Sequence, residues 1–366
     1  MKTIRSSLIA TLLLAASSLH ASTWQSVPSP NVGTRLNQLS GVSAAGDSDV
    51  WAVGANIDPQ TLRWVPLIEH WDGTSWSVVP TPALPEGTNL LNGVAVAASN
   101  DVWAVGQLFI GSLGSSLIEH WDGTSWSVVA SPNVPRVSNY LRSVTIVSPD
   151  DVWAVGYTVG NGTTPLTMHW DGSSWRIVAT PAVDDQLSAT VAIASNDVWA
   201  FGVGVREKHA AAMHWDGAQW NAVAAPPGTY GSSLNCAAAI SSTDLWAGGE
   251  NGVTATLTDH WNGAEFDSVA SPTFQYPLNN ADLLGLVALA TNDAYGVGEV
   301  LDDAEDRALV EHWNGTSWRV IEAPALRRPN SALAAITATP DGTLWAVGSS
   351  AASSKAAQTF IVRRER

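Results

Sequence analysis

Histidine and aspartate are the residues of this chain whose types could do chemistry, because imidazole and carboxylate groups exchange protons and bind metals. Copies spread evenly along a chain cannot converge on one substrate, and both residue types recur evenly here. We therefore expect the histidines to make a repeated structural hydrogen bond and the aspartates to cap turns. The histidines, each directly before a tryptophan, are His70, His120, His169, His214, His260 and His312. The aspartates, each two residues before an aromatic residue, are Asp49, Asp101, Asp151, Asp197, Asp244 and Asp293.

These recurring residues belong to a long repeat. Its cleanest copy joins Asp101-Val102-Trp103-Ala104-Val105-Gly106 to His120-Trp121-Asp122-Gly123-Thr124-Ser125-Trp126. Short apolar runs bounded by Gly, Pro, Asn and Asp predict four strands in each repeat, at 91–97, 102–106, 117–121 and 125–129 in the second. A period of about 46 to 52 residues is typical of propeller blades. The aromatic residue of the first stretch, called here the marker aromatic, recurs at Trp51, Trp103, Trp153, Trp199, Trp246, Tyr295 and Trp345.

The two ends of the chain complete each other. Residues 22–30 match the last strand of a repeat and have no repeat before them, whereas residues 333–365 hold the early strands of a repeat without its last one. Pairing the N-terminal strand with the C-terminal blade closes a ring and removes an open sheet edge. The sequence thus predicts an all-β fold, a seven-bladed β-propeller of four-stranded antiparallel blades, in a single domain over residues 22–366.

The arrangement resembles the kelch repeat of galactose-oxidase-like propellers. The resemblance implies a propeller protein of the kind that bacteria secrete. A strand ending in Gly106, a variable loop, the Trp121-Asp122 turn and a strand bearing Trp126 carry the resemblance, although a glycine pair after the second strand occurs only at Gly248-Gly249. The copper-radical chemistry of galactose oxidase needs a tyrosine cross-linked to cysteine. The one cysteine, Cys236, falls in a slot that otherwise holds Gly, Ser or Ala, so we expect a small buried residue.

No cofactor and no metal site is expected. The acidic run Asp302-Asp303-Ala304-Glu305-Asp306 lacks the spacing of an EF-hand loop and is interpreted as a solvated loop, with Ca²⁺ binding as the alternative.

Composition and charge narrow the choice of compartment and partner. Residues 1–21 read as a secretory signal peptide, with Lys2 and Arg5 before an apolar run, so we expect a secreted or periplasmic protein. The formal net charge is −16, and it is −18 without those two cations. Such a field repels phosphate backbones and anionic headgroups, which argues against nucleic-acid and membrane partners. We expect no membrane insertion and a monomer.

Candidate binding residues lie on one flat face of the predicted propeller. The first-to-second and third-to-fourth turns of each blade share a face and are repetitive, while the second-to-third loops and the blade connections vary and share the other face. Variable loops on a rigid scaffold are where binding is normally built. There we predict ligand-binding residues Trp64, Tyr140, Tyr230 and Tyr276 on the loops, with Arg142, Asn92 and Asn235 at the axis.

Arg142 would meet an anionic ligand at the mouth of the channel or else pair with Asp184 or Asp185. The resulting hypothesis is a secreted, non-catalytic propeller that recognises a glycan or an extracellular or envelope protein. Catalytic activity is left open and its absence favoured. One alternative is a polysaccharide hydrolase or lyase using Asp184, Asp185, Asp282 and Asp302, and another is a scaffold in the cell envelope.

Overall fold

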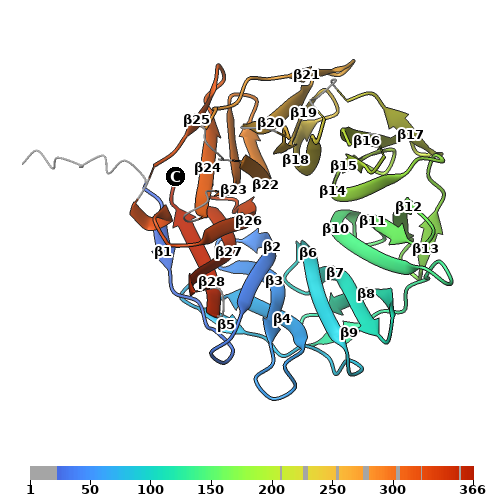
Figure 1. The fold of residues 1–366 in the computed structure, drawn as a ribbon, viewed down its shortest axis with the longest axis vertical. Helices are drawn as coiled ribbons and strands as arrows, with labels where there is room; N and C mark the ends of the chain where they lie inside the picture. Colours follow the sequence, from blue (N-terminus) through green and yellow to red (C-terminus); the bar gives the residue numbers. More distant parts are fainter. Residues whose placement is uncertain are drawn as a thin grey trace, which may run out of the picture.

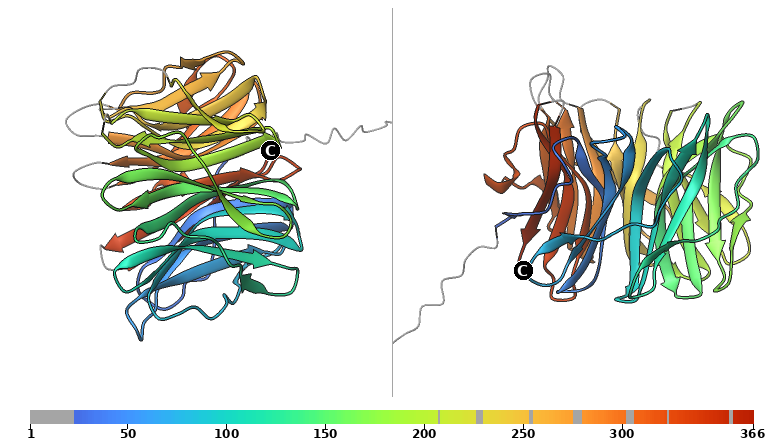
Figure 2. Two further views of the ribbon diagram at one scale, coloured as in Figure 1. Left: turned by 90° about the vertical axis from the view of Figure 1, so that its right-hand side faces the viewer. Right: turned by 90° about the horizontal axis from the view of Figure 1, so that it is seen from below.

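Seven four-stranded antiparallel sheets surround a central axis in the computed structural model, and the predicted fold class is confirmed (Figure 1). The structure describes residues 23–206, 208–225, 230–252, 255–274, 280–301, 306–322, 324–353 and 356–366. Seen from the side, the strands run across the thickness of a disc, from one flat face to the other (Figure 2). Among the described residues, no helix has the length and apolar character needed to cross a bilayer.

The strands are given blade by blade, from the axis outwards. Blades 1 to 3 are β2 (Asn37–Gly46), β3 (Asp49–Ile57), β4 (Trp64–Trp71), β5 (Trp76–Val78); β6 (Thr88–Ala98), β7 (Asp101–Ile110), β8 (Leu113–Trp121), β9 (Trp126–Val128); and β10 (Ser138–Ser148), β11 (Asp151–Val159), β12 (Thr163–Trp170), β13 (Trp175–Val178). Blades 4 and 5 are β14 (Asp185–Ala194), β15 (Asp197–Gly204), β16 (Ala210–Trp215), β17 (Trp220–Val223); and β18 (Ser233–Ser241), β19 (Asp244–Glu250), β20 (Thr256–Trp261), β21 (Phe266–Ser268). Blades 6 and 7 are β22 (Asn280–Ala290), β23 (Asp293–Leu301), β24 (Arg307–Trp313), β25 (Trp318–Val320); and β26 (Ser331–Ala338), β27 (Leu344–Ser353), β28 (Ala356–Arg364), β1 (Gln25–Val27). A short 3-10 helix, η1 (Pro324–Leu326), lies in the connection between blades 6 and 7.

Three strands of the second repeat are longer than predicted. The β7–β8 ladder continues out to the pair Ile110 and Leu113, well beyond the end of the predicted strand at Gly106. The motif marks only the buried part of this ladder, and the extension consists of loop residues that the repeat does not constrain. The variable loops are therefore shorter, and their bases more rigid, than the sequence indicated.

The N-terminal strand closes the ring as predicted. β1 pairs antiparallel with β28 through Gln25 and Arg363, Ser26 and Val362, and Val27 and Ile361. Trp24 is 3% exposed and packs in one apolar cluster with Tyr295 of blade 6 and Phe360 of β28. Trp24 thus supplies the fourth-strand tryptophan that the C-terminal repeat lacks.

The recurring tryptophans hold neighbouring blades together. Trp51 of blade 1 lies 5.0 Å from Trp121 and 5.4 Å from Trp126 of blade 2, measured between ring centroids. The same arrangement recurs at the other blade boundaries, up to Trp345 of blade 7 against Trp71 and Trp76 of blade 1, except between blades 6 and 7, where Arg364 lies 5.2 Å above the ring of Tyr295. Each marker aromatic packs against the blade that follows it. Tilted and edge-on ring pairs contribute stability in addition to that from the apolar area they bury.

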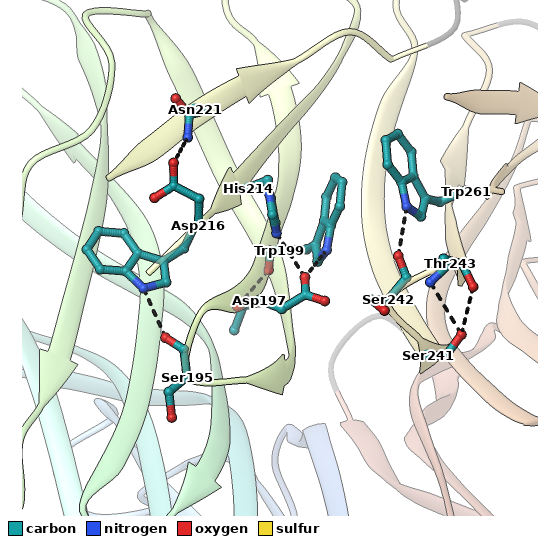
Figure 3. Close-up of polar contacts among 12 residues, drawn as sticks. Ser195, Asp197, Trp199, His214, Asp216, Asn221, Ser241, Ser242, Thr243 and Trp261 are labelled. Carbon is teal, nitrogen blue, oxygen red and sulfur yellow. Dashed lines mark hydrogen bonds and ion pairs between the residues drawn. The ribbon is translucent and has the colours of Figure 1, made fainter. Parts of the chain in front are cut away.

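The recurring histidines make the structural hydrogen bond expected of them, within a blade. In blade 4, the Asp197 carboxylate accepts from His214 Nε2 at 2.9 Å and from Trp199 Nε1 at 2.8 Å (Figure 3). The other five histidine–aspartate pairs span 2.8 to 2.9 Å. The capping role expected of these aspartates is wrong, because each carboxylate instead accepts from the recurring histidine, which strand register places opposite the marker aromatic.

Turn capping falls instead to the aspartate of the hairpin turn. Asp122 Oδ1 accepts from the backbone N–H groups of Thr124 at 2.8 Å and Ser125 at 2.9 Å. The hydroxyl of Thr124 also donates to it, and these hydrogen bonds lower the pKa of Asp122 to about 2. The repeated face of the propeller is thus built from self-contained turns.

The two faces carry the loops predicted for them. On the repeated face, Trp121 Nε1 at the end of the third strand donates to the carbonyl of Ser99 in the first turn, at 3.1 Å. On the variable face, the blade connection contacts the first half of β8, where Asn133 Oδ1 accepts from the Ser116 N–H at 2.8 Å. The turns and connections thus lie on the faces to which the sequence assigned them.

Candidate functional site: the mouth of the central channel

Every inner strand carries one extra residue at the same place. In β2 the pairing with β3 shifts between Leu39 and Gly41, and an equivalent shift occurs in each of the other six blades. Such β-bulges re-aim a side chain. The seven bulge residues all line one central cavity of about 220 Å³ on the axis, and they are Ser40, Asn92, Arg142, Ser188, Asn235, Leu284 and Ala334.

The final glycine of the Trp-Ala-Val-Gly stretch makes room for the bulge. A Cβ atom on Gly156 would lie 1.9 Å from the carbonyl oxygen of Tyr140, and one on Gly106 would lie 1.9 Å from that of Leu90. No side chain fits at such a distance, so the backbone of the inner strand can approach only a glycine. The glycine of the repeat motif therefore shapes the central cavity, because it permits the bulge whose side chain points to the axis.

The axial residues give the cavity a polar side and an apolar side. Blades 1 to 5 contribute hydroxyl, amide and guanidinium groups, whereas blades 6 and 7 contribute Leu284 and Ala334. The prediction that Asn92, Arg142 and Asn235 meet at the axis is confirmed. Deeper in the ring a second hollow of about 380 Å³ is lined mainly by aliphatic side chains, among them Val96, Ile146 and Val191.

Both axial asparagines already have partners. Asn92 Nδ2 donates to Gln107 Oε1 at 2.6 Å and to the carbonyl of Leu141 at 2.7 Å. Asn235 Nδ2 donates to both carboxylate oxygens of Asp282, at 2.9 and 3.0 Å. The bonds to Leu141 and Asp282 join neighbouring blades, and no residue in the described part of the chain hydrogen-bonds the side-chain carbonyl oxygen of either asparagine.

Arg142 is the one cation among the described residues that line this cavity. Its side chain is exposed and makes no hydrogen bond or ion pair within the described part of the chain. The alternative pairing with Asp184 does not occur, because Asp184 pairs with Arg206 at 3.1 Å. An arginine in this condition is a ready partner for a carboxylate or sulfate group.

An aromatic cluster lies at the variable-face end of the strand that carries Arg142. Tyr140, two residues earlier on β10, stacks on Tyr157 of β11 with ring centroids 5.0 Å apart and an interplanar angle of 29°. Phe109 of β7 lies 5.8 Å from Tyr140. All three rings are partly exposed, and together they form an aromatic trio at the variable face between blades 2 and 3.

The other predicted site residues are scattered. Trp64 begins β4 in blade 1 and is partly buried, and Tyr230 lies in the connection between blades 4 and 5 with 75% of its surface exposed. Neither lines the central cavity. Tyr276 lies outside the described residues, as do Asp302 to Glu305 of the acidic run.

The described carboxyl groups considered for catalysis, Asp184, Asp185 and Asp282, lie in different blades. Asp184 and Asp185 line a hollow of about 710 Å³ at blade 4. Asp282 lies in β22 of blade 6, where burial, with smaller contributions from the nearby carboxylates Glu250 and Glu299, raises its pKa to about 7. A carboxyl group titrating near neutrality can serve as a proton donor.

Four further carboxyl groups are buried between the blades, and the sequence reasoning missed them. Glu69, Glu119, Asp259 and Glu311 occupy one register position, directly before the recurring histidine, and all are 0% exposed. No described residue hydrogen-bonds the carboxyl oxygens of Glu69 or Glu119. Burial raises the pKa of Glu69, Glu119 and Glu311 to about 8 and that of Asp259 to about 7. In β4, Glu69 alternates with the buried residues Leu67 and Trp71, and this alternation is the signal in the sequence that Glu69 is buried as well.

Cys236 is a buried structural residue. It is 5% exposed, and its thiol donates to the carbonyls of Gly248 at 3.3 Å and Leu283 at 3.5 Å. Burial raises the pKa of this thiol well above its usual range, which suppresses nucleophilic character. Within the described ranges, no three histidine, cysteine, aspartate or glutamate side chains gather as metal ligands would.

Solved structures share the fold over nearly the whole chain. A structure described as YCF48 bound to D1 peptide is 17% identical, with a TM-score of 0.56 over 98% of this chain and 99% of that one. A GH74 xyloglucanase from Xanthomonas campestris is 13% identical, with a TM-score of 0.60 over 92% of this chain and 55% of that one. A PL25 ulvan lyase bound to -[GlcA(1-4)Rha3S]- is 10% identical, with a TM-score of 0.54 over 92% and 96%.

These likenesses show the propeller fold, which binding proteins and polysaccharide enzymes share. No family model matches the chain, the kelch repeat included, and no curated protein matches it. The fold implied by the kelch resemblance is thus confirmed, while membership of that family is not supported.

Proposed function

We propose that this protein is an exported, non-catalytic binding propeller that recognises an acidic glycan at the mouth of its central channel. The observation that carries the proposal is Arg142, an exposed cation without a protein partner, aimed at the axis by a bulge. The chain as a whole carries a net charge of −16, so its general field repels an anionic ligand. A cation at the mouth is therefore a specific attraction, and it selects one place on the surface.

The neighbouring groups suit a sugar chain. Sugar rings present flat C–H faces to aromatic side chains, and the partly exposed stack of Tyr140 on Tyr157 offers such a face two residues from Arg142 along β10. The carbonyl oxygens of Asn92 and Asn235 can accept hydrogen bonds from hydroxyl groups. Two of the structurally similar proteins act on polysaccharides according to their descriptions, and one of them is bound to a uronate-containing chain.

Arg142→Gln tests the proposal with little risk to folding. We expect the chain to bind uronate-containing or sulfated glycans on an array and Arg142→Gln to bind them at least about tenfold more weakly, since a charge-assisted pair contributes about 1.5 to 3 kcal/mol. Arg176→Gln is the matched control, because Arg176 is an exposed arginine on β13 that pairs with Asp171. Equal binding by Arg142→Gln, or binding of neutral glycans alone, would contradict the proposal.

A second candidate function rests on Asp282. Its carboxyl group lies beside the channel-lining Asn235 and titrates near neutrality, which suits the general acid of a polysaccharide-cleaving enzyme. Incubating the chain with each glycan that it binds, and assaying new reducing ends or unsaturated products, separates the two functions. Cleavage that disappears in Asp282→Asn would favour the enzyme, and unchanged glycans would favour the binding protein.

A further inference from the structure

A further pocket, not described above, opens on the variable face at blade 6, away from the central channel. Its volume is about 600 Å³, within the range of sites that hold small molecules. The walls come from the end of β23, the start of β24, the end of β25 and the connection that contains η1. We refer to it as the blade-6 pocket.

The floor of the blade-6 pocket is apolar. Val300, Leu309 and Leu326 are 6%, 2% and 6% exposed, and Val320 is 39% exposed. Phe274, from the connection between blades 5 and 6, adds a partly buried ring. A ligand with an apolar body would bury both its own surface and that of Val320, and removing this apolar surface from water favours binding.

Three arginines surround this apolar floor. Arg307 begins β24, and Arg327 and Arg328 follow η1. The guanidinium of Arg328 lies 5.1 Å above the ring of Phe360 and donates to Ser26 Oγ at 2.8 Å, so it is held in place. Arg327 pairs with Glu322 at 3.0 Å, with both side chains about three-quarters exposed at 75% and 76%. An ion pair this exposed is weak and can be exchanged for a ligand anion.

The hollow at the same place in blade 4 has the opposite character. Its walls carry Asp184 and Asp185 with a single arginine, Arg206, over a floor of small residues such as Ala210 and Ala212. The propeller fold therefore supplies the hollow at this position, and the side chains of blade 6 give it an apolar floor and a cationic rim. In a chain with only 17 lysines and arginines against 33 acidic residues, three arginines on one pocket are a concentrated positive site.

We propose that the blade-6 pocket binds a small amphipathic anion, a carboxylate or sulfonate head on a flat apolar body. The head lies against Arg307 and Arg327, and the body lies over Leu309, Val320 and Leu326. Glu322 competes with the ligand for Arg327. This site is separate from the proposed glycan site, because the two cavities share no lining residue.

Fluorescence titration with 8-anilinonaphthalene-1-sulfonate, a flat apolar sulfonate, tests this proposal on the folded chain. We expect one saturable site that weakens as salt is added. Arg307→Gln and Arg327→Gln should each weaken binding about five- to tenfold, and Glu322→Gln should tighten it several-fold because it leaves Arg327 to the ligand. The uncharged analogue N-phenyl-1-naphthylamine should bind more weakly than the sulfonate.

Arg142→Gln serves as the matched control, because it alters the channel and leaves the blade-6 pocket intact. Loss of the dye in Arg142→Gln alone would overturn the inference and place the anion in the channel. Equal binding of the charged and uncharged dyes, or wild-type affinity in both Arg307→Gln and Arg327→Gln, would also overturn it. The melting temperature of each variant should match that of the wild type, since all these side chains are exposed. Glycan binding that survives in the two pocket variants keeps the two proposals distinguishable.

Discussion

Raising the pH from about 5 to about 8 should lower the free energy of unfolding of this protein by roughly 5 kcal/mol or more. Glu69, Glu119 and Glu311 release their protons at about pH 8 in the folded protein, against an ordinary value of 4.5. The unfolded chain releases them near that ordinary value. Between the two values the folded state holds more protons than the unfolded state, so each group contributes stability at low pH that is lost as the pH rises through its folded pKa.

The turn aspartates set the acid limit of this profile. Hydrogen bonds from Thr74, Thr124 and Ser173 lower the pKa values of Asp72, Asp122 and Asp171 to about 2. Their contribution is present above the ordinary pKa of 3.8 and is lost as the pH falls toward 2. Stability should therefore peak between roughly pH 4 and pH 5, below the neutral range in which many proteins are most stable. Urea unfolding at a series of pH values measures the profile.

Glu119→Met identifies the groups responsible. Blades 3 and 4 carry Met168 and Met213 at this position, fully buried, so methionine is compatible with the packing of the fold. We expect Glu119→Met to stabilise the protein by about 2 to 3 kcal/mol at pH 8 and by much less at pH 5. Glu86→Met, at a side chain that is 90% exposed, is the control and should leave the profile unchanged. A flat profile, or equal effects of the two variants, would rule out the buried carboxyl groups as its source.

Gly156→Ala should destabilise the protein by about 3 kcal/mol or more and should also abolish binding at the channel. The new Cβ would lie 1.9 Å from the carbonyl oxygen of Tyr140 and 2.9 Å from Leu141 Cα, so β10 must move away from β11. Arg142 is the bulge residue next to this contact, and its side chain moves with the strand. Gly46→Ala is the matched control, since no atom lies within 4 Å of a Cβ there and its φ lies outside the positive range.

The melting temperature and the glycan affinity of Gly156→Ala and Gly46→Ala test this prediction. Wild-type stability in Gly156→Ala would show that the inner strand yields without loss, and the bulge would then not depend on the glycine. A stability loss with unchanged glycan affinity would separate the bulge from the binding of the ligand.

The sequence predicted the repeated parts of the molecule well. Seven marker aromatics at a near-constant period are enough to count blades, and the unmatched segment around Trp24 is enough to close the ring. The small residue at the position of Gly41 and Cys236 indicated the crowding at the axis. These features follow from sequence because each repeat must bury the same faces against its neighbours.

The site followed from the sequence only in part. Arg142, Asn92 and Asn235 were found because they share a register position, and the structure brings them to one cavity. Trp64 and Tyr230 were chosen as loop aromatics, and loop position alone does not tell whether a side chain points to the axis. The bulge itself was invisible, since one extra residue in a strand leaves the apolar pattern unchanged on either side.

The sequence does not reveal that the residues of the blade-6 pocket lie together. Arg307 and Arg328 are 21 positions apart in the chain. Their proximity depends on how the connection containing η1 folds back along β24, and no repeat constrains that path. The buried glutamates were hidden for another reason, because a charged residue within a strand is ordinarily taken to face water.

The pairing of β1 with β28 also sets the order of folding. Gln25 and Arg363 are neighbours in the ladder although 338 positions separate them along the chain, while the strand pairs of the other six blades join residues at most a few tens of positions apart. Contacts between distant residues carry the largest loop-closure entropy and form slowly. Individual blades can thus form while the chain is still emerging, but the circle shuts only when its last strand is available. Until β1 pairs with it, the outer edge of β28 is unpaired, and the rate of this single step decides how long the molecule is open to pairing with another copy of itself.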